Sequence, residues 1–237
     1  METVDVLRLG LRAQSASFRL PEGHGFQPTL PLPPVTALVG LIGAAVGLNY
    51  REAQGYVQGR RLRLGIVGKS SGRAKDLWKH RKIKAKEIVS SVVVRELLMD
   101  LSVRFFIAGS KGAVEELYDA FISPRYALSL GTSDDLAMWD RPEILKDLPI
   151  ISLERLENTC VRGDISGNCR VDLDISKVPL NCSIRPPRVA LLPCSFSFDK
   201  GERRVSAKEK FTFVDLPVRL DEPVKGIMVD GESVPLL

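Results

Sequence analysis

Cysteine and long apolar runs are both scarce in this chain of 237 residues. The four cysteines, Cys160, Cys169, Cys182 and Cys194, lack the close CxxC pairs that are typical of structural zinc sites. We therefore expect four reduced, mostly buried thiols, and we expect neither a metal nor another cofactor.

The longest apolar stretch, residues 35–48, is too short to cross a bilayer. The N-terminal sequence METVDVLRLGLR begins with acidic residues and alternates, which is unlike a secretion signal. The hydrophobic content of 44% is that of a soluble globular protein. These features together predict a cytoplasmic protein without a membrane anchor.

Acidic residues are nearly missing from one stretch, between Arg60 and Lys86. This stretch has eleven basic residues and one acid, Asp76, so it carries +10, whereas the whole chain carries +5. The rest of the chain therefore carries −5. Such a localised charge indicates a polyanionic partner bound at one place. The alternative is a solvated or disordered basic loop.

Apolar periodicity predicts the main elements. Alternation favours strands at residues 4–12, 61–67, 88–98 and 101–108, with Leu7, Leu9 and Leu11 on one face of the first. Helices are expected over 35–48, after Pro33 and Pro34, and over 112–122, and a further strand over 126–130. The basic segment, residues 68–85, has few large apolar residues and is expected to form a protruding loop or hairpin.

This order predicts an α+β fold on the ferredoxin-like βαββαβ plan. RNA-recognition domains use the same plan and bind RNA on the open face of the sheet. After about residue 148, short apolar runs alternate with proline, glycine and charges. We therefore predict a ferredoxin-like domain at 1–148, with a basic insertion at about 69–86, and a small β-rich region at 149–237.

Three stretches carry a resemblance to a known family. They are PTLPLPPVTALVGLIGAAVGL (28–48), VVVRELLMDLSVRFFI (92–107) and SPRYALSLGTSDDL (123–136). In this order and spacing, with a basic insertion after the second strand, the chain resembles the fifth family of CRISPR-associated (Cas) proteins. These are RAMP subunits of type I Cascade surveillance complexes, which act in antiviral defence.

The resemblance implies a subunit of a ribonucleoprotein complex that binds and caps the 5′ handle of CRISPR RNA (crRNA). It also implies contacts with the backbone and large subunits of Cascade, and with target DNA only through the complex. In the family the insertion is a thumb that kinks the RNA, and here the thumb falls at about residues 69–86.

Several residues are candidates for RNA contact. Trp78 among cations either stacks a base or anchors the loop, and Thr36 is expected to cap the first helix, whose free N–H groups attract phosphate. Arg95 and Arg125 either bind RNA or form structural salt bridges, whereas Asp134 and Asp135 are expected to face solvent. The full set of candidates is Arg12, Arg19, Thr36, Lys69, Arg73, Lys75, Trp78, Lys79, His80, Arg81, Lys82, Lys84, Lys86, Arg95 and Arg125.

Histidine is scarce as well, since only His24 and His80 are present. Some family members cleave precursor crRNA without metal, and such a cut needs a base, commonly histidine, to activate the 2′-hydroxyl. No such constellation can be assembled from spacing alone, so we expect a non-catalytic protein. The alternatives are a metal-independent endoribonuclease, a protein-only assembly scaffold, and an unrelated single-strand RNA-binding domain of the same fold.

Overall fold

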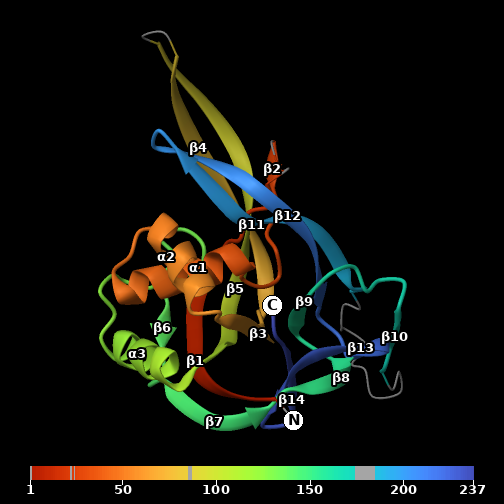
Figure 1. Cartoon of the computed structure of the whole chain (residues 1–237). Coiled ribbons are helices and arrows are strands. Elements are labelled where there is room, and N and C mark those ends of the chain that lie inside the picture. Colours follow the sequence, from red (N-terminus) through yellow and green to blue (C-terminus); the bar gives the residue numbers. More distant parts are fainter. Residues whose placement is uncertain (1, 22, 24, 85–86, 174–184) are drawn as a thin grey trace.

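The computed structural model describes residues 2–21, 23, 25–84, 87–173 and 185–237, with side chains 80–89 left out of the description (Figure 1). The fold is of the α+β class and rich in antiparallel sheet, with three helices in the described chain: α1 (Val35–Val46), α2 (Tyr50–Gly59) and α3 (Lys111–Ile122). None of the helices in these residues is long and apolar enough to cross a membrane.

Ten of the described strands form one large sheet, whose main path has the order β11-β12-β9-β3-β5-β1-β6. Every pairing in it is antiparallel except that of β2 with β5, and β4 also pairs with β5 and β7 with β1. The strands are β1 (Thr3–Ala16), β2 (Phe26–Gln27), β3 (Arg63–Lys69), β4 (Gly72–Lys84), β5 (Glu87–Gly109), β6 (Met138–Trp139), β7 (Glu143–Pro149), β9 (Thr159–Arg162), β11 (Arg188–Asp199) and β12 (Glu202–Val214).

A second, four-stranded sheet follows in the C-terminal region. It contains β8 (Ile151–Leu156), β10 (Cys169–Val171), β13 (Val218–Val229) and β14 (Glu232–Pro235). Strands β9, β11 and β12 come from the same region but extend the large sheet. The division of the chain into two domains at residue 148 stays a prediction.

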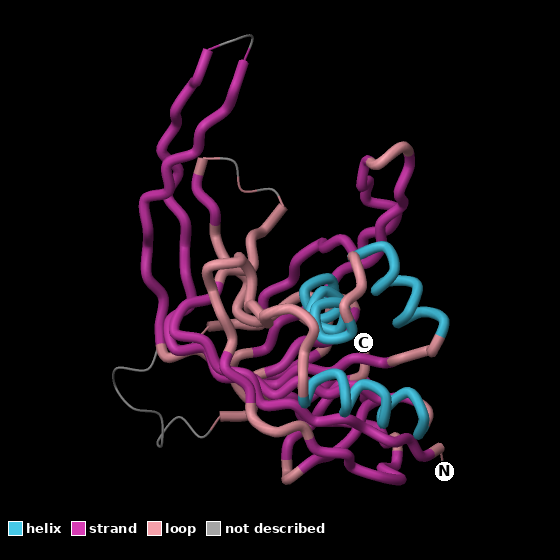
Figure 2. Tube along the Cα trace, turned by 90° about the vertical axis from the view of Figure 1, so that its left-hand side faces the viewer, coloured by secondary structure: helices cyan, strands magenta, loops and turns pink. Residues whose placement is uncertain are grey.

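The large sheet is covered on both faces. Leu9 of β1 and Phe105 of β5 lie in one core cluster with α1 and α3, and both are fully buried. Val6 and Phe106, on the opposite face, pack with Ile227 of the second sheet. The predicted alternation along the first strand is therefore confirmed, because a strand sends successive side chains to opposite faces. Figure 2 shows the helices gathered on one side of the strands.

Most predicted elements are present with shifted ends. The strands predicted at 88–98 and 101–108 form one strand, β5, and the helix at 35–48 ends earlier, before Gly47. Gly47 adopts a left-handed conformation (φ 89°) as the C-cap of α1, which favours glycine. Helix α2 was not predicted, although Asn49 and Glu52 form a capping box at its start.

The strand predicted at 126–130 is wrong. The N–H groups of Arg125 and Tyr126 donate to Ala45 and Ala44 at the end of α1, at 2.9 and 3.0 Å. Farther along, Leu130 donates to Asp135 within a local turn, leaving only an isolated bridge between Ser129 and Leu136. The segment thus satisfies its backbone by closing α1 rather than by joining the sheet.

The predicted protrusion is a β-hairpin. Strands β3 and β4 pair with β5 in the same register, from Arg63 opposite Ala108 to Lys84 opposite Glu87, with a short interruption at residues 70–71 and 100–101. The hairpin is therefore the outward continuation of the central β3–β5 pair, and it stands clear of the body in Figure 1.

A buried polar network holds the base of this hairpin. The Glu96 carboxylate accepts hydrogen bonds from Arg73 at 2.8 Å and from the Thr29 backbone N–H at 3.0 Å. The side chains of Arg73 and Glu96 are only 18% and 16% exposed. This network ties β4 and β5 to the segment that follows β2.

The variant Glu96→Gln is expected to lower the free energy of unfolding by about 2–4 kcal/mol, because it leaves the largely buried Arg73 without its counter-charge. Urea denaturation measures the effect. The control Glu116→Gln breaks the Arg60–Glu116 pair at 2.8 Å, whose side chains are 40% and 46% exposed. A decrease below about 1 kcal/mol is expected there. Equal decreases in the two variants would contradict the structural role given to Glu96.

Candidate nucleic-acid interface

The candidate interface is the basic hairpin, which we define as β4 together with residues 87–98 of β5. Residues paired across an antiparallel ladder share one face of it. The register places two groups of side chains on opposite faces. We call the first the cationic face, and it consists of Arg73, Lys75, Leu77 and Lys79 of β4 with Val92, Val94 and Glu96 of β5.

On the opposite face of the basic hairpin, the charged side chains that the structure describes pair with each other. Arg95 forms an ion pair with Asp76 at 2.9 Å, and its guanidinium lies 6.0 Å from the Trp78 ring centre. The Arg95 side chain is 18% exposed, whereas Trp78 is 42% exposed. Of the two roles left open for Arg95, the structure shows the salt bridge, and it gives Trp78 a cation–π contact within the hairpin.

The cationic face keeps its charge available. Lys75 and Lys79 are exposed, and no carboxylate of the described chain lies within ion-pair distance of either one. The Lys75 ammonium lies 5.6 Å from the ring centre of Phe26, which β2 brings alongside. Sequence reasoning missed Phe26, because a strand of two residues is too short to show alternation.

A cleft of about 450 Å³ lies at the base of the basic hairpin, lined by Arg73, Glu96, Asp215 and the stretch 185–188. Arg73 and Arg188 both donate to the Thr29 carbonyl oxygen at 3.4 Å. Burial and then the neighbouring charge of Arg73 lower the pKa of Arg188. A second cleft of about 400 Å³ adjoins it and includes the exposed Lys69. Four cationic residues thus surround the base of the hairpin: Lys69, Arg73, Arg185 and Arg188.

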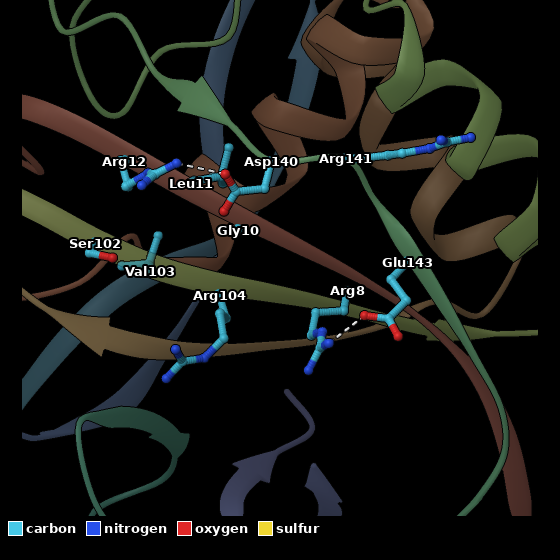
Figure 3. Close-up of a pocket in the computed structure, with 10 residues that line it drawn as sticks. All are labelled: Arg8, Gly10, Leu11, Arg12, Ser102, Val103, Arg104, Asp140, Arg141 and Glu143. Atoms are coloured by element: carbon cyan, nitrogen blue, oxygen red, sulfur yellow. Dashed lines mark hydrogen bonds and ion pairs between the residues drawn. The ribbon is translucent and has the colours of Figure 1, made fainter. Parts of the chain in front are cut away.

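A third cleft, of about 300 Å³, lies on the sheet face opposite α1 (Figure 3). Three of its four arginines have acidic partners. Arg12 pairs with Asp140 at 2.7 Å, and Arg104 pairs with Glu232. Arg8 contacts Glu143 and Asp230; burial opposes a rise in its pKa, but these hydrogen bonds outweigh burial and raise it. The predicted site residue Arg12 therefore faces away from α1 and has a partner.

The start of α1 differs from the prediction. Pro34 is the N-cap, and no side chain caps the helix; Thr36 lies within the first turn, half-buried. The prediction that Thr36 caps α1 is therefore wrong, because Pro34 already provides the extended residue that precedes the helix. Arg19 is exposed and donates to the Gly23 carbonyl oxygen at 3.1 Å, within its own loop.

Arg125 covers the end of α1. A Cβ atom on Gly47 would lie 2.8 Å from Cγ of Arg125, so the aliphatic part of this side chain packs over the helix cap. The residue is exposed, and no ion pair joins it to any acid in the described part of the chain. It thus has a packing role and an available guanidinium.

The turn after Leu130 holds a buried carboxylate. Asp135 is 5% exposed and accepts hydrogen bonds from Ser15 and from Thr132, the latter at 2.8 Å, whereas Asp134 is exposed. The prediction that both aspartates face solvent is therefore wrong for Asp135, which closes its own turn. Gly131 (φ 118°) fits there because a Cβ atom would lie 2.1 Å from the Ser17 carbonyl oxygen.

Five predicted residues cannot be placed in full. The side chains of His80, Arg81, Lys82 and Lys84 lie outside the description, although their backbone belongs to β4, and Lys86 lies outside the described residues altogether. The same holds for His24 and for Cys182. Cys160, Cys169 and Cys194 are free thiols, and burial raises the pKa of each. No cluster of three potential metal ligands occurs among the residues that the structure describes.

Comparison with known proteins supports a fold shared with CRISPR proteins. A chain titled "CRISPR RNA-guided surveillance complex" is 17% identical, covers 93% of this chain and 91% of its own length, and has a TM-score of 0.52. A CRISPR protein from Archaeoglobus fulgidus is 9% identical, with coverage of 98% and 100% and the same TM-score of 0.52. A further structure, of a Cas protein, is 23% identical but has a TM-score of 0.37, and the match spans 54% of this chain and 57% of that one.

No curated protein matches the chain. A family model, however, matches residues 6–143, and its description is CRISPR-associated protein (Cas_Cas5). The match confirms the resemblance drawn from the three sequence stretches. Because it spans more than half of the 237 residues, the chain belongs to this family of CRISPR-associated proteins.

Proposed function

We propose that this protein is a non-catalytic subunit of a type I Cascade surveillance complex that binds and caps the 5′ handle of crRNA. The observation that carries the proposal is the cationic face of the basic hairpin, where Lys75 and Lys79 are exposed on a projecting arm. Family membership and a fold shared with a surveillance-complex chain support it. Its partners are crRNA and the backbone and large subunits of Cascade, in the cytoplasm.

The charge pattern favours RNA over a purely protein partner. Each phosphate that a lysine or arginine neutralises releases counterions, which makes binding strong and dependent on salt. Arginines elsewhere, such as Arg8, Arg12 and Arg104, already have acidic partners. Lys75 and Lys79 of the hairpin, in contrast, are exposed and have no acidic partner among the described residues.

We also propose that the ferredoxin-like plan holds for the N-terminal part, with a fourth strand other than the predicted one. Strands β7, β1, β5 and β3 lie side by side and antiparallel, with α1 and α3 over one face. On this assignment the basic hairpin is an insertion between the second strand and the third, and β7 replaces residues 126–130.

Replacing Lys79, Arg81, Lys82 and Lys84 by alanine together is expected to weaken binding to a handle-containing RNA. The dependence of log Kd on log salt should also become shallower, by about 0.7 for each phosphate that the protein no longer neutralises. Filter binding at several salt concentrations measures both quantities.

The matched control removes the same charge from exposed lysines outside the hairpin, Lys111, Lys146, Lys208 and Lys225. It is expected to leave the salt slope close to that of the parent protein. An unchanged salt slope in the hairpin variant would show that the hairpin is not part of the RNA site. Assembly with the other Cascade subunits in the absence of RNA would favour the protein-only scaffold.

A precursor RNA that contains the repeat, labelled at its 5′ end, is expected to remain intact with this protein in EDTA. The reason is that the sequence offers only His24 and His80 as histidine bases for a metal-independent cut. Gel electrophoresis of the products tests this, alongside the variants His24→Ala and His80→Ala. A single cut that one of these variants abolishes would make the protein an endoribonuclease.

A further inference from the structure

Phe26 is held beside the cationic face of the basic hairpin by the short strand β2. This strand runs parallel to β5 and places Phe26 next to Val94. Residues after it are clamped, because Leu20 donates to the Pro28 carbonyl at 3.2 Å and Thr29 bonds to Glu96 at 3.0 Å. The position of the ring is therefore fixed by backbone pairing and by the buried network at the hairpin base.

An apolar row crosses three strands at this point. Phe26 lies next to Val94, which lies opposite Leu77 on β4. Phe26 is 42% exposed and Leu77 is 70% exposed, a large exposure for apolar side chains on a sheet. The row is open to solvent, as a surface that receives a planar ring must be.

Cations flank this row, and acids are scarce on it. Lys75 lies 5.6 Å from the Phe26 ring centre, and Lys79 follows Leu77 on the same face. Glu96, the carboxylate that the described register places on this face, is already bonded to Arg73 and Thr29. The combination of an aromatic ring, an exposed apolar row and available cations is the pattern by which proteins hold unpaired bases.

We propose that Phe26 stacks an unpaired base of single-stranded RNA, while Lys75 and Lys79 contact the flanking phosphates. The proposal rests on the proposed RNA-binding function and adds a base-binding site to it. Trp78 is equally exposed at 42% but lies on the opposite face, against Arg95. The stacking aromatic is therefore Phe26 and not the tryptophan that the sequence draws attention to.

The test uses two fluorescein-labelled probes of equal length, a 15-nucleotide oligouridine and an abasic ribose-phosphate chain with the same number of phosphates. Fluorescence anisotropy gives Kd for the parent protein, Phe26→Leu, Phe26→Trp and Trp78→Leu. Phe26→Leu is expected to raise Kd for oligouridine by about 5- to 100-fold. It should leave abasic binding within about twofold and the salt slope unchanged, because no charge is removed.

The other two variants serve as controls. Phe26→Trp keeps an aromatic ring and is expected to bind with a Kd close to that of the parent protein. Comparison of this variant with Phe26→Leu separates the effect of the ring from the effect of changing a residue in β2. Trp78→Leu, which removes an equally exposed aromatic from the opposite face, is expected to change Kd less than about threefold.

Each contrary result overturns a different statement. If the parent protein binds both probes equally, or if Phe26→Leu weakens both equally, no base is stacked on Phe26 although RNA binding stands. If Trp78→Leu rather than Phe26→Leu selectively weakens oligouridine binding, the site lies on the opposite face. If the parent protein binds the handle-containing RNA but neither probe, the general stacking site is wrong and the proposed function stands. If it binds none of the three, both are wrong.

Discussion

The antiparallel pairing along β5 is the interaction on which the rest of the structure depends. Its 23 residues extend roughly 75 Å at about 3.3 Å per residue, from the buried centre of the large sheet to the hairpin tip. Because β3 and β4 pair with it in the same register, the basic hairpin continues the central sheet through β5. The inner end of β5 packs between two hydrophobic clusters.

Charge is distributed on this frame in two different ways. Most arginines of the sheet, including Arg8, Arg12, Arg95 and Arg104, have acidic partners that offset their charge. The lysines of the cationic face do not have such partners among the described residues. This separation suits the proposed RNA-binding role, because unneutralised charge is costly in a core and attracts polyanions on a projecting surface.

Local patterns in the sequence predict the helices and strands that bury one face. The structure of other segments depends on contacts with residues that are distant in the sequence. The first strand, with Leu7, Leu9 and Leu11 on one face, could be predicted because burial of one face produces a repeating apolar pattern. The same holds for the first helix, which prolines precede. The apolar content of residues 126–130 favours a strand, but the N–H of Tyr126 bonds to the end of α1 and that of Leu130 to Asp135. Residue spacing cannot reveal these contacts.

The sequence predicts the charged segment of the candidate site, but it does not predict which side chains share a face of the hairpin. Composition marked the basic segment and the family resemblance named it a thumb, yet only the register divides its residues between two faces. For that reason Trp78 drew attention, whereas Phe26, outside the basic segment, did not. Burial of Asp135 and the ion pair of Arg95 likewise depend on partners that are distant in sequence.

The most direct test of the central claim is photo-crosslinking from the hairpin in the assembled complex. A benzophenone amino acid would replace Leu77, on the cationic face, and in a control protein Met228 of the second sheet, which is 43% exposed. We predict that Leu77 crosslinks to the 5′ handle of crRNA and that Met228 does not. Crosslinking of Leu77 to a protein subunit, without any RNA adduct, would contradict it.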